Sequence, residues 1–170
     1  MRQDRFESLT GCLKAQKYGK FLDLLSGMPQ DVVKQVDKKG RNLLLIMMRY
    51  LSNELDDKET QKVQELISVL TRPVKKQSQS AFMAICDAQK GYGISIESKD
   101  SRGYNILHTL AKHSQGMFSV ALESILTKDQ VLRLLNEKSK VKWKATPLVL
   151  YALVYQGIEN SDCSKFIKLL

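Results

Sequence analysis

Apolar residues recur along much of the chain at the spacing of a helix that buries one stripe. From Lys20 to Leu25 the second, third, fifth and sixth positions are apolar, and residues 165–170 repeat this pattern. We predict helices over residues 4–15, 18–25, 42–53, 56–70, 80–89, 118–126 and 129–135, and two more that begin at Asn105 and Thr146. The chain is therefore expected to be all-α, apart from the turns or hairpins that join its helices.

Glycine and proline separate the predicted helices. Gly27 and Pro29 follow the second helix, and Pro73 follows the helix over residues 56–70, because proline lacks the N–H that a continuing helix needs. Residues 31–41 are predicted to form a turn or finger. Residues 91–96 combine glycines with alternating isoleucines, which favours an extended segment or a short hairpin.

A short motif occurs more than once along the chain. It reads D-K-K-G-R-N-L-L-L-I-M-M from Asp37 and D-S-R-G-Y-N-I-L-H-T-L-A from Asp100. A third copy, less complete at its front, reads A-T-P-L-V-L-Y-A from Ala145. Each copy places a turn before a helix that is apolar along its whole length, which predicts a helix packed on several sides.

The polar positions of this motif have architectural roles. Gly40 and Gly103 stand where the turn needs a positive φ, which glycine adopts without steric cost. Asn42, Asn105 and Thr146 are the predicted N-caps of the helices that follow. Pro147 would then occupy the first helical position, where its missing N–H costs nothing.

The motif resembles the ankyrin repeat with its T-P-L-H-x-A core. The resemblance implies a short solenoid of paired antiparallel helices that binds other macromolecules through its finger turns and the concave face of its inner helices. It also implies that His108 hydrogen-bonds the backbone of a neighbouring turn. Successive N-caps lie 63 and 41 residues apart, against an ankyrin period of about 33. We therefore expect residues 1–170 to form one domain of four or five degenerate units. The 25 residues from Ser80 to Asn105 are too few for a full unit, so residues 80–89 either lack an outer helix or belong to an enlarged unit that starts at Asn42.

Composition agrees with a folded domain in a reducing compartment. The 170 residues are 43% hydrophobic, and no apolar stretch approaches the roughly 20 residues of a membrane span. The charged N-terminus shows no secretory signal. Three cysteines without a C-x-x-C pair favour neither a zinc site nor a disulfide framework. We expect a cytoplasmic protein, or one in the host cytosol if it is a secreted bacterial effector, which degenerate repeats of this kind resemble.

The sequence offers no catalytic arrangement, so we do not expect an enzyme, a cofactor or a metal site. His108 and His113 are the only histidines, and neither is accompanied by a nucleophile motif or by a pair of acids at hydrolase spacing. The G-x-G at residues 91–93 lacks the rest of a phosphate-binding loop.

Charge indicates the class of partner. The net charge is +9, and the predicted turns carry many of the basic residues. Stacked turns would bring these residues to one edge, although solvated turn charges are an equally good interpretation. The candidate partner-binding residues are Lys38, Lys39, Arg41, Lys99, Arg102, Lys138, Lys140, Lys142, Trp143 and Lys144. Trp143 stands among lysines in the most basic turn and is the candidate anchor. An acidic protein is the partner we expect.

Two other interpretations stay open. Nucleic acid is a second class of partner for a basic edge, but aromatic residues, only 7% of the chain, are not interleaved with the basic ones outside Trp143. The chain is alternatively the targeting domain of a larger enzyme or effector. Its last residues, Leu169 and Leu170, form an apolar stripe without a polar capping unit. We therefore expect a fragment of a longer protein, or self-association through this end.

Overall fold

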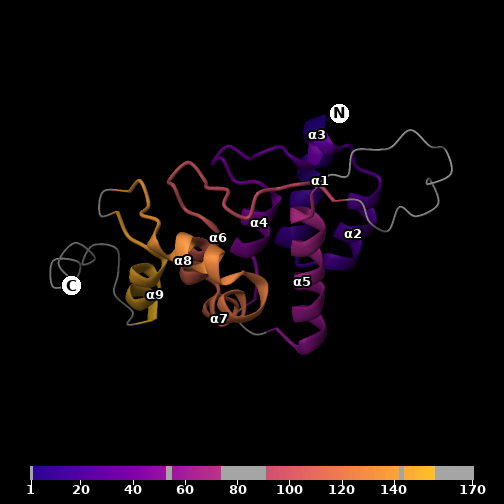
Figure 1. Cartoon of the computed structure of the whole chain (residues 1–170). Coiled ribbons are helices and arrows are strands. Elements are labelled where there is room, and N and C mark those ends of the chain that lie inside the picture. The colour runs from indigo at the N-terminus through magenta and orange to yellow at the C-terminus, as the bar shows by residue number, and fades with distance from the viewer. Residues whose placement is uncertain (1, 53–54, 74–90, 142–143, 156–170) are drawn as a thin grey trace.

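The described residues of the computed structural model, 2–52, 55–73, 91–141 and 144–155, contain helices and no strand. The all-α prediction is therefore confirmed for this part of the chain (Figure 1). The elements are α1 (Arg2–Lys14), α2 (Tyr18–Ser26), α3 (Gln30–Val33), α4 (Leu43–Arg49), α5 (Asp57–Thr71), α6 (Ile106–His113), α7 (Gln115–Val120), the π-helix η3 (Ala121–Ile125), α8 (Lys128–Asn136) and α9 (Pro147–Tyr155). The predictions for residues 80–89 and 165–170, for Lys142 and Trp143, and for Leu169 and Leu170 lie outside the described residues.

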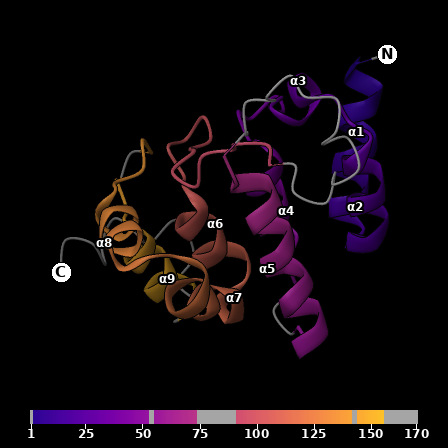
Figure 2. The ribbon, with the colours of Figure 1, turned by 45° about the vertical axis from the view of Figure 1, so that its right-hand side comes forward.

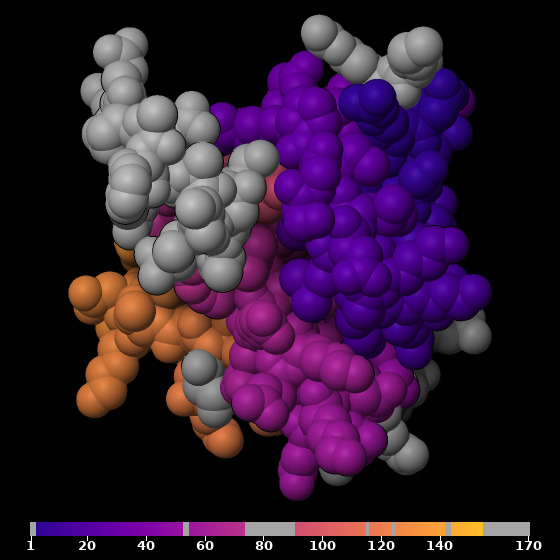
Figure 3. Space-filling view, turned by 90° about the vertical axis from the view of Figure 1, so that its right-hand side faces the viewer, coloured from indigo at the N-terminus to yellow at the C-terminus, as the bar shows by residue number. Residues whose placement is uncertain are grey.

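Four helices pack in series and form what we call the inner row. Helix α1 contacts α4, α4 contacts α6, and α6 contacts α9. A second set of helices flanks this row: α2 contacts α1 and α5, and α8 contacts α6 and α9 (Figure 2). Residues from α1 to α5 cover most of the face seen in Figure 3.

The inner row explains why two short helices are buried at nearly every position. Helix α4 lies between α1 and α6, and its residues 43–48 are all buried. Helix α6 lies between α4 and α9, and its residues 106–111 are all buried, polar ones included. A helix covered on both sides needs apolar or internally bonded side chains at nearly every position.

Side-chain caps fix where the helices begin, as predicted. The Asn42 side chain accepts from the amide of Leu45 at 2.9 Å, and the Asn105 side chain accepts from the amide of His108 at 3.0 Å. Asp56 and Glu59 form a reciprocal capping box at the start of α5. Thr146 accepts from the amide of Val149 at 3.4 Å, which leaves Pro147 as the first residue of α9.

The predicted helix over residues 42–53 is wrong at its end, because α4 stops at Arg49. Side chains that follow α1 and α6 bind the backbone just beyond it. The Gln16 amide donates to the carbonyl of Tyr50 at 2.8 Å, and the Ser114 hydroxyl donates to the carbonyl of Ser52 at 3.0 Å. The predicted finger over residues 31–41 also needs correction, since α3 occupies residues 30–33.

The predicted hairpin over residues 91–96 is absent. The amides of Gly93 and Ile94 instead donate to the carbonyls of Arg72 and Leu70, each at 2.9 Å. These residues therefore cap the C-terminal end of α5, whose last carbonyls have no partner within the helix. A Cβ on Gly91 would lie 2.3 Å from the carbonyl oxygen of Arg72, so this close approach requires glycine.

Candidate functional site

Three turns precede helices of the inner row, and their backbones follow one plan. In the first turn, residues 37–41, the amide of Asp37 donates to the carbonyl of Arg41 at 3.0 Å. In the second turn, residues 100–104, Asp100 and Tyr104 make the same bond at 3.0 Å. In the third turn, of which residues 139–141 and 144–145 are described, the amide of Ser139 donates to the carbonyl of Ala145 at 2.9 Å.

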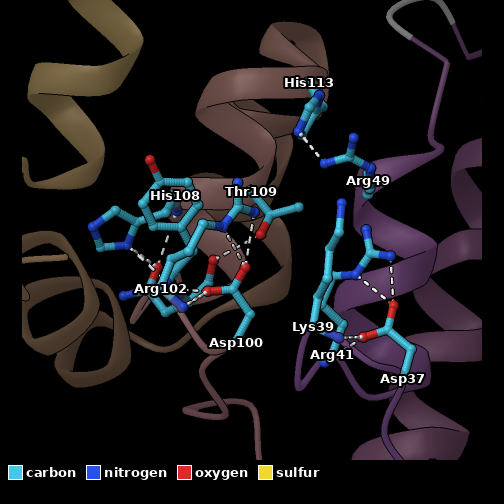
Figure 4. Close-up of polar contacts among 11 residues, drawn as sticks. Asp37, Lys39, Arg41, Arg49, Asp100, Arg102, His108, Thr109 and His113 are labelled. Carbon is cyan, nitrogen blue, oxygen red and sulfur yellow. Dashed lines mark hydrogen bonds and ion pairs between the residues drawn. The ribbon is translucent and has the colours of Figure 1, made fainter. Parts of the chain in front are cut away.

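The first turn is organised by the carboxylate of Asp37. It accepts hydrogen bonds from the amides of Lys39 at 2.8 Å and Arg41 at 2.9 Å, and from Nε of Arg41 at 2.7 Å (Figure 4). Partial burial works to raise the pKa of Asp37, but the hydrogen bonds from Arg41 and Lys39 outweigh it and hold this pKa below its ordinary value. Gly40 has a φ of 70°, as predicted.

The second turn repeats this arrangement with more complete burial. The Asp100 carboxylate accepts from the amides of Arg102 and Tyr104, each at 2.9 Å, and from Nε and Nη2 of Arg102 at 3.0 and 2.8 Å. The Arg102 guanidinium also lies 4.4 Å from the centre of the Tyr104 ring. The predicted positive φ of Gly103 is confirmed at 77°.

The third turn lacks both the aspartate and the glycine. Ser139 replaces the aspartate, and its buried hydroxyl has no hydrogen-bond partner among the described residues. Lys144 stands two residues before the N-cap Thr146, as Gly40 and Gly103 stand two residues before theirs. Lys144 has a φ of 45°, in the left-handed region that side chains with a Cβ rarely adopt.

Backbone hydrogen bonds join the three turns side by side. The amide of Ser101 donates to the carbonyl of Lys39 at 2.9 Å, and the amide of Lys140 donates to the carbonyl of Arg102 at 2.7 Å. A Cβ on Gly103 would lie 2.9 Å from Cγ of Lys140, so the turns touch closely. We call this continuous edge, made of residues 37–41, 100–104, 139–141 and 144–145, the turn strip.

The turn strip also shows how the irregular spacing between the motif copies is accommodated. The first and second turns are in direct contact, as are α4 and α6, although their motif copies start 63 residues apart. No helix among the described residues lies between these neighbours in the inner row. Residues 91–99 return to the strip past the end of α5.

A buried polar cluster lies beneath the second and third turns. The Nε2 of His108 lies 3.0 Å from the carbonyl oxygen of Ala145, the predicted bond to a neighbouring turn. The Asn105 amide donates to the carbonyl of Leu134 at 2.9 Å and to Glu137 at 2.7 Å. Glu137 in turn pairs with Lys99 at 2.7 Å. The cluster ties α6, α8 and two turns together.

Both histidines have lowered pKa values. Burial is the main cause at His108, and the hydrogen bond to Ala145 and the charge of Glu137 oppose it. Burial, followed by the positive charge of Arg49, lowers the pKa of His113 to about 4. The neutral His113 ring accepts from Arg49, whose Nη1 lies 2.9 Å from Nε2, and so links α6 to α4 (Figure 4).

The predicted partner-binding residues divide into two groups. Arg41, Arg102 and Lys99 are held in ion pairs with Asp37, Asp100 and Glu137. The other described members are exposed and form no ion pair within the described part of the chain: Lys38, Lys39, Lys138, Lys140 and Lys144. Sequence reasoning had treated both groups alike.

Sequence reasoning missed a hollow of about 750 Å³ beside the first turn. Residues of α1, the segment 35–41 and Ile46 line it. Val36, 56% exposed, lies in this lining. An apolar residue in a run of polar ones, directly before the first motif copy, is the sequence signal that marks this place.

Within the described residues, no three histidine, cysteine or acidic side chains gather in a way that would hold a metal ion. The same residues include no helix with the length and apolar character needed to cross a membrane. Comparison of the chain with protein-family models, curated proteins and solved structures gave no match.

Proposed function

We propose that this protein is a binding module, built as an ankyrin-type solenoid, that recognises an acidic protein surface through the lysines of its turn strip. The strip supports a shared role for these lysines because hydrogen bonds between turns bring residues from distant parts of the sequence to one edge. The proposal includes the concave side of the inner row next to the strip.

The observation that carries the proposal is the contrast between paired and unpaired cations. Each of the first two turns satisfies its aspartate with one arginine, so those charges are already balanced. The exposed lysines Lys38, Lys39 and Lys140 have no such counter-charge among the described residues. Exposed like charges on one edge attract an acidic surface and speed its association.

The backbone of Lys144 gives independent support. A non-glycine residue in the left-handed region costs roughly 1–2 kcal/mol relative to an ordinary conformation. Gln16 also has a positive φ, of 55°, but its side chain donates a hydrogen bond to the carbonyl of Tyr50. This contact within the fold offsets the backbone strain at Gln16. The Lys144 side chain is exposed and has no hydrogen bond or ion pair among the described residues. Strain kept at such a position points to a role in recognition.

Acidic protein is favoured over single-stranded nucleic acid because the described part of the strip offers no stacking surface. Its one aromatic residue, Tyr104, is buried, and its ring stacks on His108 at 5.3 Å between centroids. Proteins that bind single strands stack exposed aromatic side chains on the bases.

Fluorescence anisotropy with a labelled polyglutamate peptide tests the proposal. We expect Lys38→Glu and Lys140→Glu each to weaken binding several-fold, with an effect that shrinks as salt rises. Lys62→Glu on α5 is the matched control, because this exposed lysine lies away from the strip. An equal loss in the control would show that net charge alone drives binding and would refute the proposal. A mobility shift with duplex DNA that responds to the same two variants, without peptide binding, would favour nucleic acid.

A further inference from the structure

The turn strip has an open end at its first turn. Each later turn donates the amide of its second residue, Ser101 or Lys140, to a carbonyl of the turn before it. Lys38 is the second residue of the first turn, and its amide has no acceptor among the described residues. Within the described part of the chain, the donor that joins neighbouring turns elsewhere therefore has no acceptor at this end.

The hollow lies next to this unused donor. Lys38 is one of its lining residues, and α1 supplies others, Phe6 and Thr10 among them. Phe6 and Ile46 are buried and contribute apolar surface, and Val36 exposes more. The lining thus combines apolar side chains with the residue that carries this donor, which suits a peptide rather than a small ion.

The charges around the hollow are mainly positive. Lys14, Lys38 and Lys39 line it and form no ion pair among the described residues, whereas Arg41 and Asp37 are paired with each other. One further acid, Glu7, lies in the wall. An occupant that complements this lining carries acidic residues.

We propose that the hollow binds an extended acidic segment of the partner protein, in the place that a preceding turn would occupy. A backbone carbonyl of the segment accepts from the amide of Lys38, as Lys39 accepts from Ser101 one turn further on. An apolar side chain of the segment enters the space between Phe6, Val36 and Ile46, and flanking glutamates or aspartates face Lys14 and Lys39. Addition of an extended segment to an open backbone edge is a recurring mode of peptide recognition. This proposal rests on the proposed function and assigns a specific subsite to it.

The test uses a labelled synthetic peptide with one leucine between two runs of glutamate. Two control peptides replace the glutamates by glutamine or the leucine by serine. We expect the first peptide to bind more tightly than either control, and its addition to shift the amide resonance of Lys38 in a ¹⁵N-labelled sample.

Variants confined to the hollow separate this proposal from the general one. Lys14→Glu and Val36→Ser should each weaken binding of the leucine peptide by about three- to tenfold, since a tenfold change corresponds to about 1.4 kcal/mol. Val36→Ser should remove the advantage of leucine over serine in the peptide. Lys62→Glu is again the control, and an unchanged circular dichroism spectrum shows that each variant folds.

The remaining outcomes are decisive. Binding that is lost in Lys140→Glu but unchanged in Lys14→Glu and Val36→Ser would overturn the subsite and leave the proposed function in place. A leucine peptide that binds no better than the serine peptide would do the same. Absence of binding by any acidic peptide would refute both proposals.

Discussion

The two junctions of the turn strip share one backbone contact and differ in what lies beneath it. In each junction an amide of the later turn donates to a carbonyl of the earlier one. The third residue of the helix below is Leu45 at the first junction and His108 at the second, and both are buried. The first junction is therefore apolar below its surface, and the second holds the cluster of His108, Asn105 and Glu137.

The difference follows from what orders each turn. The first two turns are held from within, because their own aspartates accept the turn amides. The third turn has Ser139 at that position, and the carbonyl of Ala145 accepts both from the Ser139 amide of its own turn and from His108 beneath it. The third turn is therefore tied to the helix below by a contact that, among the described residues, the first two turns lack. The described part of this third turn carries two exposed lysines, Lys140 and Lys144, and the first turn carries two as well, Lys38 and Lys39.

The largest expected effect comes from the residue that orders the middle turn, which belongs to both junctions. Asp100→Ala should lower the free energy of unfolding by about 2–4 kcal/mol, because it leaves two amides and the Arg102 guanidinium without their acceptor. Urea denaturation measures this change. Asp37→Ala is the matched variant and should cost less, since the Asp37 side chain is 21% exposed and that of Asp100 only 3%. Equal losses would mean that burial does not distinguish the two turns.

The next largest loss of stability should come from adding a side chain where neighbouring turns touch. Gly103→Val should cost roughly 1–3 kcal/mol through its positive φ and the contact with Lys140. Gly40→Val should cost somewhat less, because the nearest atom to its new Cβ would be Ser101 N at 3.1 Å rather than two atoms of Lys140 at 2.9 and 3.0 Å. Thermal unfolding midpoints compare the two variants. Unchanged midpoints would show that neither junction depends on close contact.

Local signals made much of this architecture predictable from the sequence. Asn42, Asn105 and Thr146 fix helix starts through contacts within three residues, so their identity alone locates the caps. Gly40 and Gly103 likewise reveal a backbone conformation that few other residues adopt.

Features that depend on side-chain geometry or on distant partners were not predictable. Arg41 lies four residues after its aspartate and Arg102 only two, yet both guanidinium groups reach the carboxylate, so no single spacing identifies the pair. Helix α4 ends early because Gln16 and Ser114, far away in the sequence, bind the backbone that follows it. Residues 91–96 adopt the shape of the helix end they cap rather than the hairpin that their alternation suggests.

A smaller effect depends on pH and on the two histidines. His108 lies beneath the second junction, and His113 pairs with Arg49 where α6 and α4 end. The pKa of each histidine in the folded protein lies below the ordinary value of 6.5, that of His113 at about 4. The unfolded chain then binds protons more readily, so stability is full above about pH 6.5 and falls as the pH drops toward 4.

His113→Gln keeps a polar partner for Arg49 and removes the titrating group. It should reduce the loss of stability between pH 6.5 and 4 by about 1–2 kcal/mol, a value discounted for the partial exposure of the ring. Urea denaturation at several pH values measures it. His108→Gln tests the second junction in the same way, and we expect a smaller change because Ala145 and Glu137 oppose the shift there. A wild-type protein whose stability is constant over this range would contradict both expectations.

The smallest effect on stability is the most informative about function. Lys144→Gly gives the third turn the residue that the first two turns have at the same position, and it removes the cost of the left-handed conformation. We expect a gain in stability of about 0.5–1 kcal/mol, reduced from the full strain because glycine is more flexible in the unfolded chain. The same variant should weaken binding of the polyglutamate peptide, since one exposed lysine is lost from the strip. Lys144→Asn separates the two causes, because asparagine tolerates the left-handed region but carries no charge. It should share the loss of binding and part of the gain in stability. If Lys144→Gly gains stability and binds acidic peptide unchanged, the strain has no function in recognition, and the lysines of the third turn are only solvated.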